Sequence, residues 1–249
     1  MMIQKLSAAV AIASLSTFGA FAPVSISFNN SQSQAFLPVV IGDASAQAGM
    51  NYVPPGDGKL PQRTQGSGAR GCTNSIPVTL NLLTPNDHAA RTTSARPTFL
   101  WHISEKTTAP MIFTLTAPGS NQPIYQQRLK ADKAGVMTLE LPAAAPELAV
   151  NKNYRWTVAI VCNEKRPSQN INARAWIERV PVTSQLRQKL AYSKTESDRA
   201  LVYTSSGIWN DGLTILNQLQ STNPTSKEAS NLFASLLEQV GLNKIARRG

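Results

Sequence analysis

The segment Asn153–Cys162 constrains the fold of this chain more than any other. Its large apolar side chains recur at every second position, which directs them to one face of an extended strand. Leu148 lies six residues before Tyr154, across a turn. This is the spacing of a tyrosine corner, in which a phenol ties down the loop that enters a central strand of a two-sheet sandwich. The alternating residues are Tyr154, Trp156, Val158, Ile160 and Cys162.

Six further short segments have strand-like patterns and are separated by turn residues. They are Pro77–Leu83, Arg96–Ser104, Met111–Ala117, Ile124–Lys130, Val136–Leu141 and Ile171–Val180. With Asn153–Cys162 they predict a seven-stranded antiparallel sandwich over residues 72–182, because no helical pattern interrupts them. Trp101 and Trp156 are expected at the centre of its core. The order and spacing of the strands resemble a fibronectin type III domain, an immunoglobulin-like sandwich.

The pattern becomes helical after Pro181, so residues 183–249 are expected to form a small module of about four helices. Thr183 and Ser184 can cap the first helix, and capping boxes at 195–198 and 225–228 open two others. The helix Ile208–Gln220 is amphipathic. The offsets of eight residues are similar to one tetratricopeptide repeat: Ala200, Tyr203, Gly207, Trp209, Gly212, Leu216, Leu219 and Pro224.

The N-terminus has the features of a signal peptide over residues 1–46. Lys5 precedes the apolar run Leu6–Phe21, and Ala44-Ser45-Ala46 has the small-x-small pattern of a cleavage site. Cleavage is expected after Ala46, with Ala22 as the alternative position. A membrane anchor is the other interpretation, but polar residues interrupt the run, and no later segment is long enough to span a bilayer. The mature protein is therefore expected in the periplasm or outside the cell.

Residues 47–71 are rich in Gly, Pro, Gln and Ser and predict a disordered linker. The two cysteines of the chain, Cys72 and Cys162, lie beyond this linker. In an oxidising compartment they predict one disulfide. Such a bond would close a loop of about 90 residues. The entropy that the unfolded chain loses on closing such a loop predicts a stabilisation of the folded state by roughly 4–5 kcal/mol.

The composition favours an anionic partner and offers little catalytic chemistry. The 24 Lys and Arg residues outnumber the 14 Asp and Glu residues. They form no dense block, so an anionic envelope polymer is expected rather than nucleic acid. His88 and His102 are too few for a metal cluster, and no nucleophile motif accompanies them. No metal, no cofactor and no enzymatic activity are expected.

The last predicted strand carries the candidate binding residues. If Ala173 and Ala175 face inward, Arg174 and Trp176 face outward, where they can stack on a sugar or hold a partner. The alternative, which the sequence favours, is that the following helices cover Trp176.

Several motifs together resemble the cyanobacterial family catalogued as domain of unknown function nine-two-eight. The resemblance covers about Cys72–Leu242 and implies a secreted envelope protein with no known activity. The residues that carry it are Arg96-Pro97-Thr98-Phe99-x-Trp101, Tyr154-Arg155-Trp156 through Cys162, Trp176–Arg179, Gly207–Asp211 and Val240-Gly241-Leu242.

The sequence thus predicts an exported, non-enzymatic binding or scaffolding protein of the cell envelope, whose helical module engages another protein. An anionic glycan-binding module that uses Arg174 and Trp176 is the alternative. An accessory hydrolase is a weaker one.

Overall fold

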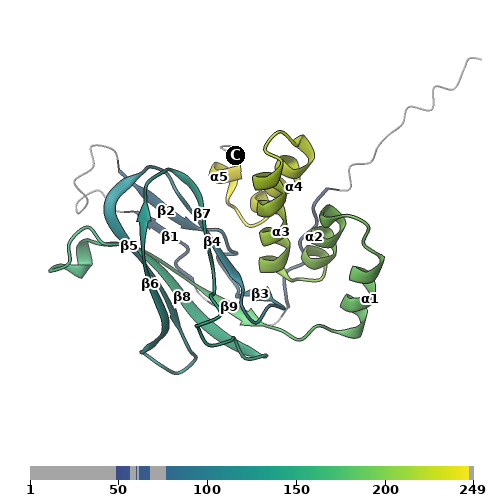
Figure 1. The fold of residues 1–249 in the computed structure, drawn as a ribbon, viewed down its shortest axis with the longest axis horizontal. Coiled ribbons are helices and arrows are strands. Elements are labelled where there is room, and N and C mark those ends of the chain that lie inside the picture. Colours follow the sequence, from purple (N-terminus) through teal and green to yellow (C-terminus); the bar gives the residue numbers. More distant parts are fainter. Residues whose placement is uncertain (1–48, 57–59, 61, 68–76, 247–249) are drawn as a thin grey trace, which may run out of the picture. The chain divides into compact units, whose positions relative to one another are not determined.

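Two β-sheets face each other and five helices follow them in the computed structural model, which describes residues 49–56, 60, 62–67 and 77–246 (Figure 1). The predicted signal peptide and Cys72 lie outside these residues. One sheet has the order β1 (Gln65–Ser67), β2 (Thr79–Leu82), β4 (Thr98–Ile103), β7 (Gly135–Glu140). The other has the order β3 (Ala90–Thr92), β9 (Ile171–Arg179), β8 (Lys152–Ile160), β5 (Thr107–Thr116), β6 (Pro123–Ala131).

The inner faces of the two sheets share one apolar core. The ring of Phe99 on β4 lies 4.8 Å from that of Phe113 on β5 and 5.1 Å from that of Trp156 on β8. Trp101 is also fully buried in this core, as its alternation with Leu100 predicts. The Tyr154 hydroxyl accepts a hydrogen bond from the Ala149 N–H at 2.9 Å. This is the contact between the tyrosine and the preceding loop that the spacing predicted.

The prediction of a seven-stranded, wholly antiparallel sandwich is wrong in two respects. All seven predicted segments contain strands, but β1 and β3 bring the described total to nine. In addition, β3 pairs with β9 in parallel. Both additional strands have three residues, which is too short for a period of two to be visible in the sequence.

The expectation of a disordered linker over residues 47–71 is corrected wherever the structure describes that stretch. Met50 and Tyr52 are 5% and 6% exposed and belong to a second apolar cluster. The side-chain amide of Gln239 donates to the Met50 carbonyl at 2.7 Å and accepts from the Tyr52 N–H at 2.8 Å. Gly and Pro exclude a helix or a central strand here, but they do not prevent such tertiary contacts. We call residues 49–56 the strap.

The helices begin where polar side chains cap them. They are α1 (Ser184–Tyr192), α2 (Glu196–Ser205), α3 (Trp209–Thr222), α4 (Lys227–Glu238) and α5 (Asn243–Ala246), and α5 is too short for a sequence pattern. Thr183 caps α1, and Thr195 with Asp198 forms the predicted capping box of α2. The cap of α4 is Ser226, which accepts a hydrogen bond from the Ala229 N–H, one position later than the predicted box implied.

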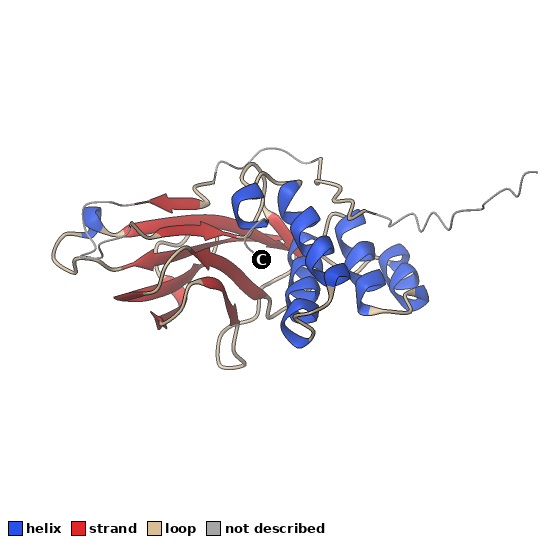
Figure 2. Cartoon of the chain, turned by 90° about the horizontal axis from the view of Figure 1, so that it is seen from above, coloured by secondary structure: helices blue, strands red, loops and turns tan. Residues whose placement is uncertain are grey.

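The helices pack on the outer side of the four-stranded sheet. Leu100 on β4 turns away from the main core and joins the cluster built by the helices, as do Leu83 and Ala90. Trp209 on α3 is fully buried there, and its Nε1 donates to the Leu83 carbonyl at 3.0 Å. Figure 2 shows the helices gathered beside one end of the sheets. The described residues from Gly49 onward therefore form one unit.

Candidate functional site

The outer face of the five-stranded sheet carries the binding residues that the sequence singled out. On β9 the four side chains that alternate with Arg174 and Trp176 are buried, from Ile171 to Ile177. Arg174 is exposed and Trp176 is half-buried on the opposite side. On β8 the inward position of Trp156 and Val158 likewise turns Arg155 and Thr157 outward.

Strand pairing brings these outward side chains together. Arg155 lies directly opposite Trp176, and Thr157 lies opposite Arg174. On the other edge of β9, Arg63 forms an isolated antiparallel bridge with Arg174. Residues opposite each other on neighbouring strands have Cβ atoms about 5 Å apart, so their side chains are within mutual reach. We call Arg63, Arg155, Arg174, Trp176 and Thr157 the basic face.

The basic face has a local excess of positive charge. Among the described residues, Arg63, Arg155 and Arg174 form no ion pair with a carboxylate. Glu178 on β9 and Glu164, in the connection between β8 and β9, pair with other cations. Glu178 pairs with Arg91 at 3.0 Å, and Glu164 pairs with Arg128 at 3.2 Å. Three guanidinium groups are therefore available to an anion, and each offers a planar set of donors that matches a carboxylate.

Trp176 is half-buried, so the helices that follow β9 do not bury it completely. Within the described part of the chain it belongs to neither apolar cluster, nor to the side chains packed against them. Its backbone N–H donates to Oε1 of Gln62 at 3.0 Å, so the segment before β1 lies beside the backbone of β9 at this residue. Trp176 thus offers a partly exposed ring beside Arg155.

Sequence reasoning found two of these residues and missed the others. The alternation that buries Tyr154 and Trp156 also places Arg155 on the outer face of the strand, so its position could have been predicted from the sequence. Arg63 had no signal, because it lies in the stretch predicted as a linker and reaches β9 only through tertiary pairing. A local pattern cannot show which edge such a segment will join.

The two histidines take structural positions. His88 is buried, with Nε2 2.6 Å from the Tyr52 hydroxyl and Nδ1 2.7 Å from Oδ1 of Asp87. Burial raises the pKa of the Tyr52 phenol well above its usual value, so this group stays neutral. His102 is also buried, although its strand position predicted an outward face. The described residues contain no cluster of metal-ligating side chains.

Cys162 follows β8 and packs, half-buried, against the main core. No described cysteine is free. Its predicted partner Cys72 lies outside the described residues, so the disulfide stays a prediction. No helix in the described ranges is long and apolar enough to cross a bilayer.

Comparisons with known proteins assign a family and no activity. A family model described as "Domain of Unknown Function (DUF928)" matches residues 65–249. The search of curated proteins gives no match. Among solved structures, a multi-domain immunophilin from Arabidopsis thaliana aligns over 80% of this chain and 97% of its own, with 7% identity and a TM-score of 0.16. A similarity this low carries no argument about fold or function.

Proposed function

The chain belongs to the DUF928 family, and we propose that it is an exported, non-enzymatic binding protein of the cell envelope that holds an anionic polysaccharide on the basic face. The observation that carries this proposal is the register of β8 and β9, which places Arg155 against Trp176 and Thr157 against Arg174. We place polysaccharide binding ahead of the alternative in which the helical module binds a protein partner. The reason is that, among the described side chains, Trp176 packs with neither apolar cluster and so can contact a ligand.

The chemistry of the basic face suits a polyanion with sugar rings. Arginine binds a carboxylate through two parallel hydrogen bonds, and an indole offers an apolar face for a ring to lie on. The residues lie across adjacent strands of a sheet, and they line none of the clefts that the structure describes. Small ligands need concave sites that bury most of their surface, whereas a polymer can gain affinity from several shallow contacts along its length.

A hydrolase is supported less well. His88 is buried, has the carboxylate of Asp87 beside one ring nitrogen and contacts the Tyr52 hydroxyl through the other. A general base must reach a substrate proton, and this ring has no exposed nitrogen to do so.

The binding proposal is tested by calorimetric titration of the purified protein with polygalacturonate, with neutral dextran as the uncharged control. We expect binding to polygalacturonate alone, and we expect it to weaken as salt is raised because the contacts are surface charges. The double variant Arg155→Ala/Arg174→Ala should weaken the affinity at least about tenfold for each guanidinium removed. This factor corresponds to a loss of about 1.4 kcal/mol of binding free energy for each charged contact. Trp176→Ala should weaken it as well.

Arg187→Ala provides the matched control. It removes the same charge from an exposed position of α1, away from the five-stranded sheet. Equal losses in Arg187→Ala and the double variant would show binding through net charge alone and would refute the basic face. Equal binding of dextran, or tighter binding of single-stranded DNA than of polygalacturonate, would refute the ligand class.

The cellular location is part of the proposal and has its own test. Export is supported by the N-terminal sequence, which lies outside the described residues. N-terminal sequencing of the protein recovered from the cell envelope should give Gln47 as the first residue. A chain recovered from the cytoplasm with Met1 in place would contradict export and leave the binding measurement unaffected.

A further inference from the structure

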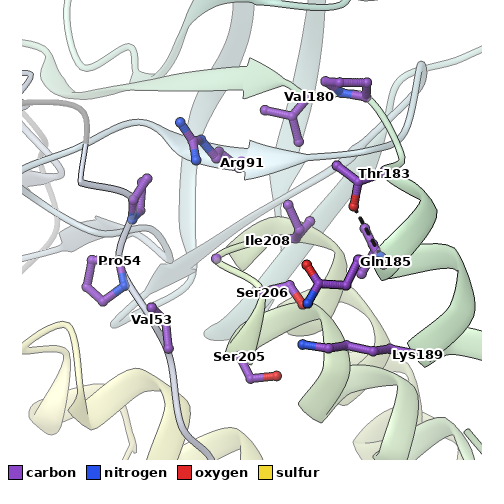
Figure 3. A pocket seen from close by; sticks show the side chains of 14 residues that line it. Val53, Pro54, Arg91, Val180, Thr183, Gln185, Lys189, Ser205, Ser206 and Ile208 are labelled. Atoms are coloured by element: carbon purple, nitrogen blue, oxygen red, sulfur yellow. Dashed lines mark hydrogen bonds between the residues drawn. The ribbon is translucent and has the colours of Figure 1, made fainter.

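A cleft of about 480 Å³ lies between α1, the turn that joins α2 to α3, and the strap (Figure 3). It is separate from the basic face: its lining contains none of the residues that define that face. Its volume lies in the range of clefts that bind small molecules, about 300–1,000 Å³.

The walls of the cleft are held in place by hydrogen bonds on two sides. On one side Val53 donates its N–H to the Thr204 carbonyl at 3.2 Å, and the ring closures of Pro54 and Pro55 restrict the backbone beyond it. On the other side the Thr183 hydroxyl accepts a hydrogen bond from the Leu186 N–H at 3.1 Å and fixes the start of α1. A site with fixed walls loses little entropy when a ligand enters.

Both charged residues among the described lining of the cleft are positive. Arg91 on β3 is held by Glu178, and Lys189 on α1 forms no ion pair within the described chain. Figure 3 shows the side chains of Lys189 and Gln185 extended toward the turn that carries Ser205 and Ser206. No acidic residue is among the described residues that line the cleft. An anionic group placed beside Lys189 therefore gains a charge-assisted hydrogen bond and meets no carboxylate that repels it.

The lining also has an aliphatic part, beside the polar side chains of Thr183, Gln185, Ser205 and Ser206. Val53, Pro54, Val180, Pro181 and Ile208 contribute carbon surface, and no aromatic ring is present. This lining differs from the basic face, where Trp176 offers a ring to a sugar. The cleft suits a ligand with an aliphatic body and one anionic end.

We propose that this cleft binds a small aliphatic carboxylate, with the carboxylate at Lys189 and the hydroxyl group of Ser206, and the hydrocarbon against Val53, Pro54 and Ile208. The inference goes beyond the proposed polysaccharide binding and does not depend on it, since it uses different residues and a different ligand.

The test is a titration of isotope-labelled protein with hexanoate, followed through backbone amide signals in two-dimensional NMR spectra, with hexanamide as the uncharged control. We expect saturable shifts centred on Gln185 and on Ser205–Gly207, with an affinity at least tenfold higher for hexanoate than for hexanamide. Lys189→Met should remove this preference for the charged ligand. Arg187→Met, on the same helix but outside the lining, should retain it.

A second variant tests the location without removing a charge. Gln185→Trp places a large ring in the cleft from an exposed position of α1, so it should abolish the hexanoate shifts while the rest of the spectrum is preserved. The proposal is overturned if hexanamide binds as tightly as hexanoate, if Lys189→Met and Arg187→Met behave alike, or if Gln185→Trp leaves the titration unchanged.

Discussion

The carboxylate of Asp211 on α3 accepts hydrogen bonds from both the backbone and the side chain of Thr93, which follows β3. The Thr93 hydroxyl lies 2.7 Å from Oδ1 and its N–H lies 3.1 Å from Oδ2. The two residues are 118 positions apart, so the contact joins the helices to the five-stranded sheet. Burial raises the pKa of the Asp211 carboxyl, and the hydrogen bonds from Thr93 and Thr92 offset this only in part.

The raised pKa of Asp211 predicts a pH dependence of stability. A carboxyl whose pKa is higher in the folded state holds its proton more tightly there, so its contribution to the free energy of unfolding falls as pH rises from the ordinary value of 3.8 through the folded pKa. Asp211→Asn cannot titrate. In urea denaturation at several pH values from 4 to 7, the free energy of the wild type minus that of Asp211→Asn should therefore decrease with pH. Parallel curves would contradict the assignment.

Gln239→Ala is expected to release the strap. The variant leaves the Met50 carbonyl and the Tyr52 N–H without their amide partner, at a cost of about 1 kcal/mol because both hydrogen bonds are only partly buried. Amide hydrogen exchange at Tyr52 and Val53 should accelerate well before global unfolding. Gln188→Ala, on the exposed side of α1, is the control and should leave that exchange unchanged. Unchanged protection in Gln239→Ala would show that the apolar contacts alone hold the strap.

Gly212→Ala should separate α2 from α3, although alanine ordinarily favours a helix over glycine by about 1 kcal/mol. A Cβ at this position would lie 2.5 Å from Cγ2 of Thr204 and 3.2 Å from the Ala200 carbonyl oxygen. Overpacking of this kind costs about 1–3 kcal/mol, measured by chemical denaturation. Thr204→Ser removes Cγ2 and keeps the hydroxyl, so it should recover part of the loss in the double variant. A Gly212→Ala protein as stable as the wild type would contradict the close approach.

Cys162→Ser tests the predicted disulfide. If Cys72 and Cys162 are bonded, the variant should lose about 2–5 kcal/mol of unfolding free energy, as removal of a native disulfide usually does. Cys72→Ser and the double variant should lose the same amount, and a reductant should destabilise the wild type but none of the variants. A wild-type protein that releases two thiols on denaturation without reductant would contradict the bond.

The sequence alone predicted the features that depend on neighbouring residues. The alternation in Asn153–Cys162 predicted β8 and its buried face, and the spacing of Leu148 and Tyr154 predicted the tie that holds the preceding loop. The caps at Thr183 and Thr195 predicted where α1 and α2 begin. It also predicted that Arg174 and Trp176 share the outer face of β9. Each of these features depends either on the repeat of side-chain directions along a strand or on a hydrogen bond between residues a few positions apart.

Only the tertiary structure decided where the segment before β2 lies. Its strap is held by Gln239, whose amide bonds lie 187 and 189 positions away along the chain, and Arg63 completes the basic face by pairing with Arg174. The parallel pairing of β3 with β9 is of the same kind. A sequence pattern records which face of a segment is apolar. The partner that covers a short or Pro-rich segment depends on the surfaces that the rest of the chain presents once it has folded.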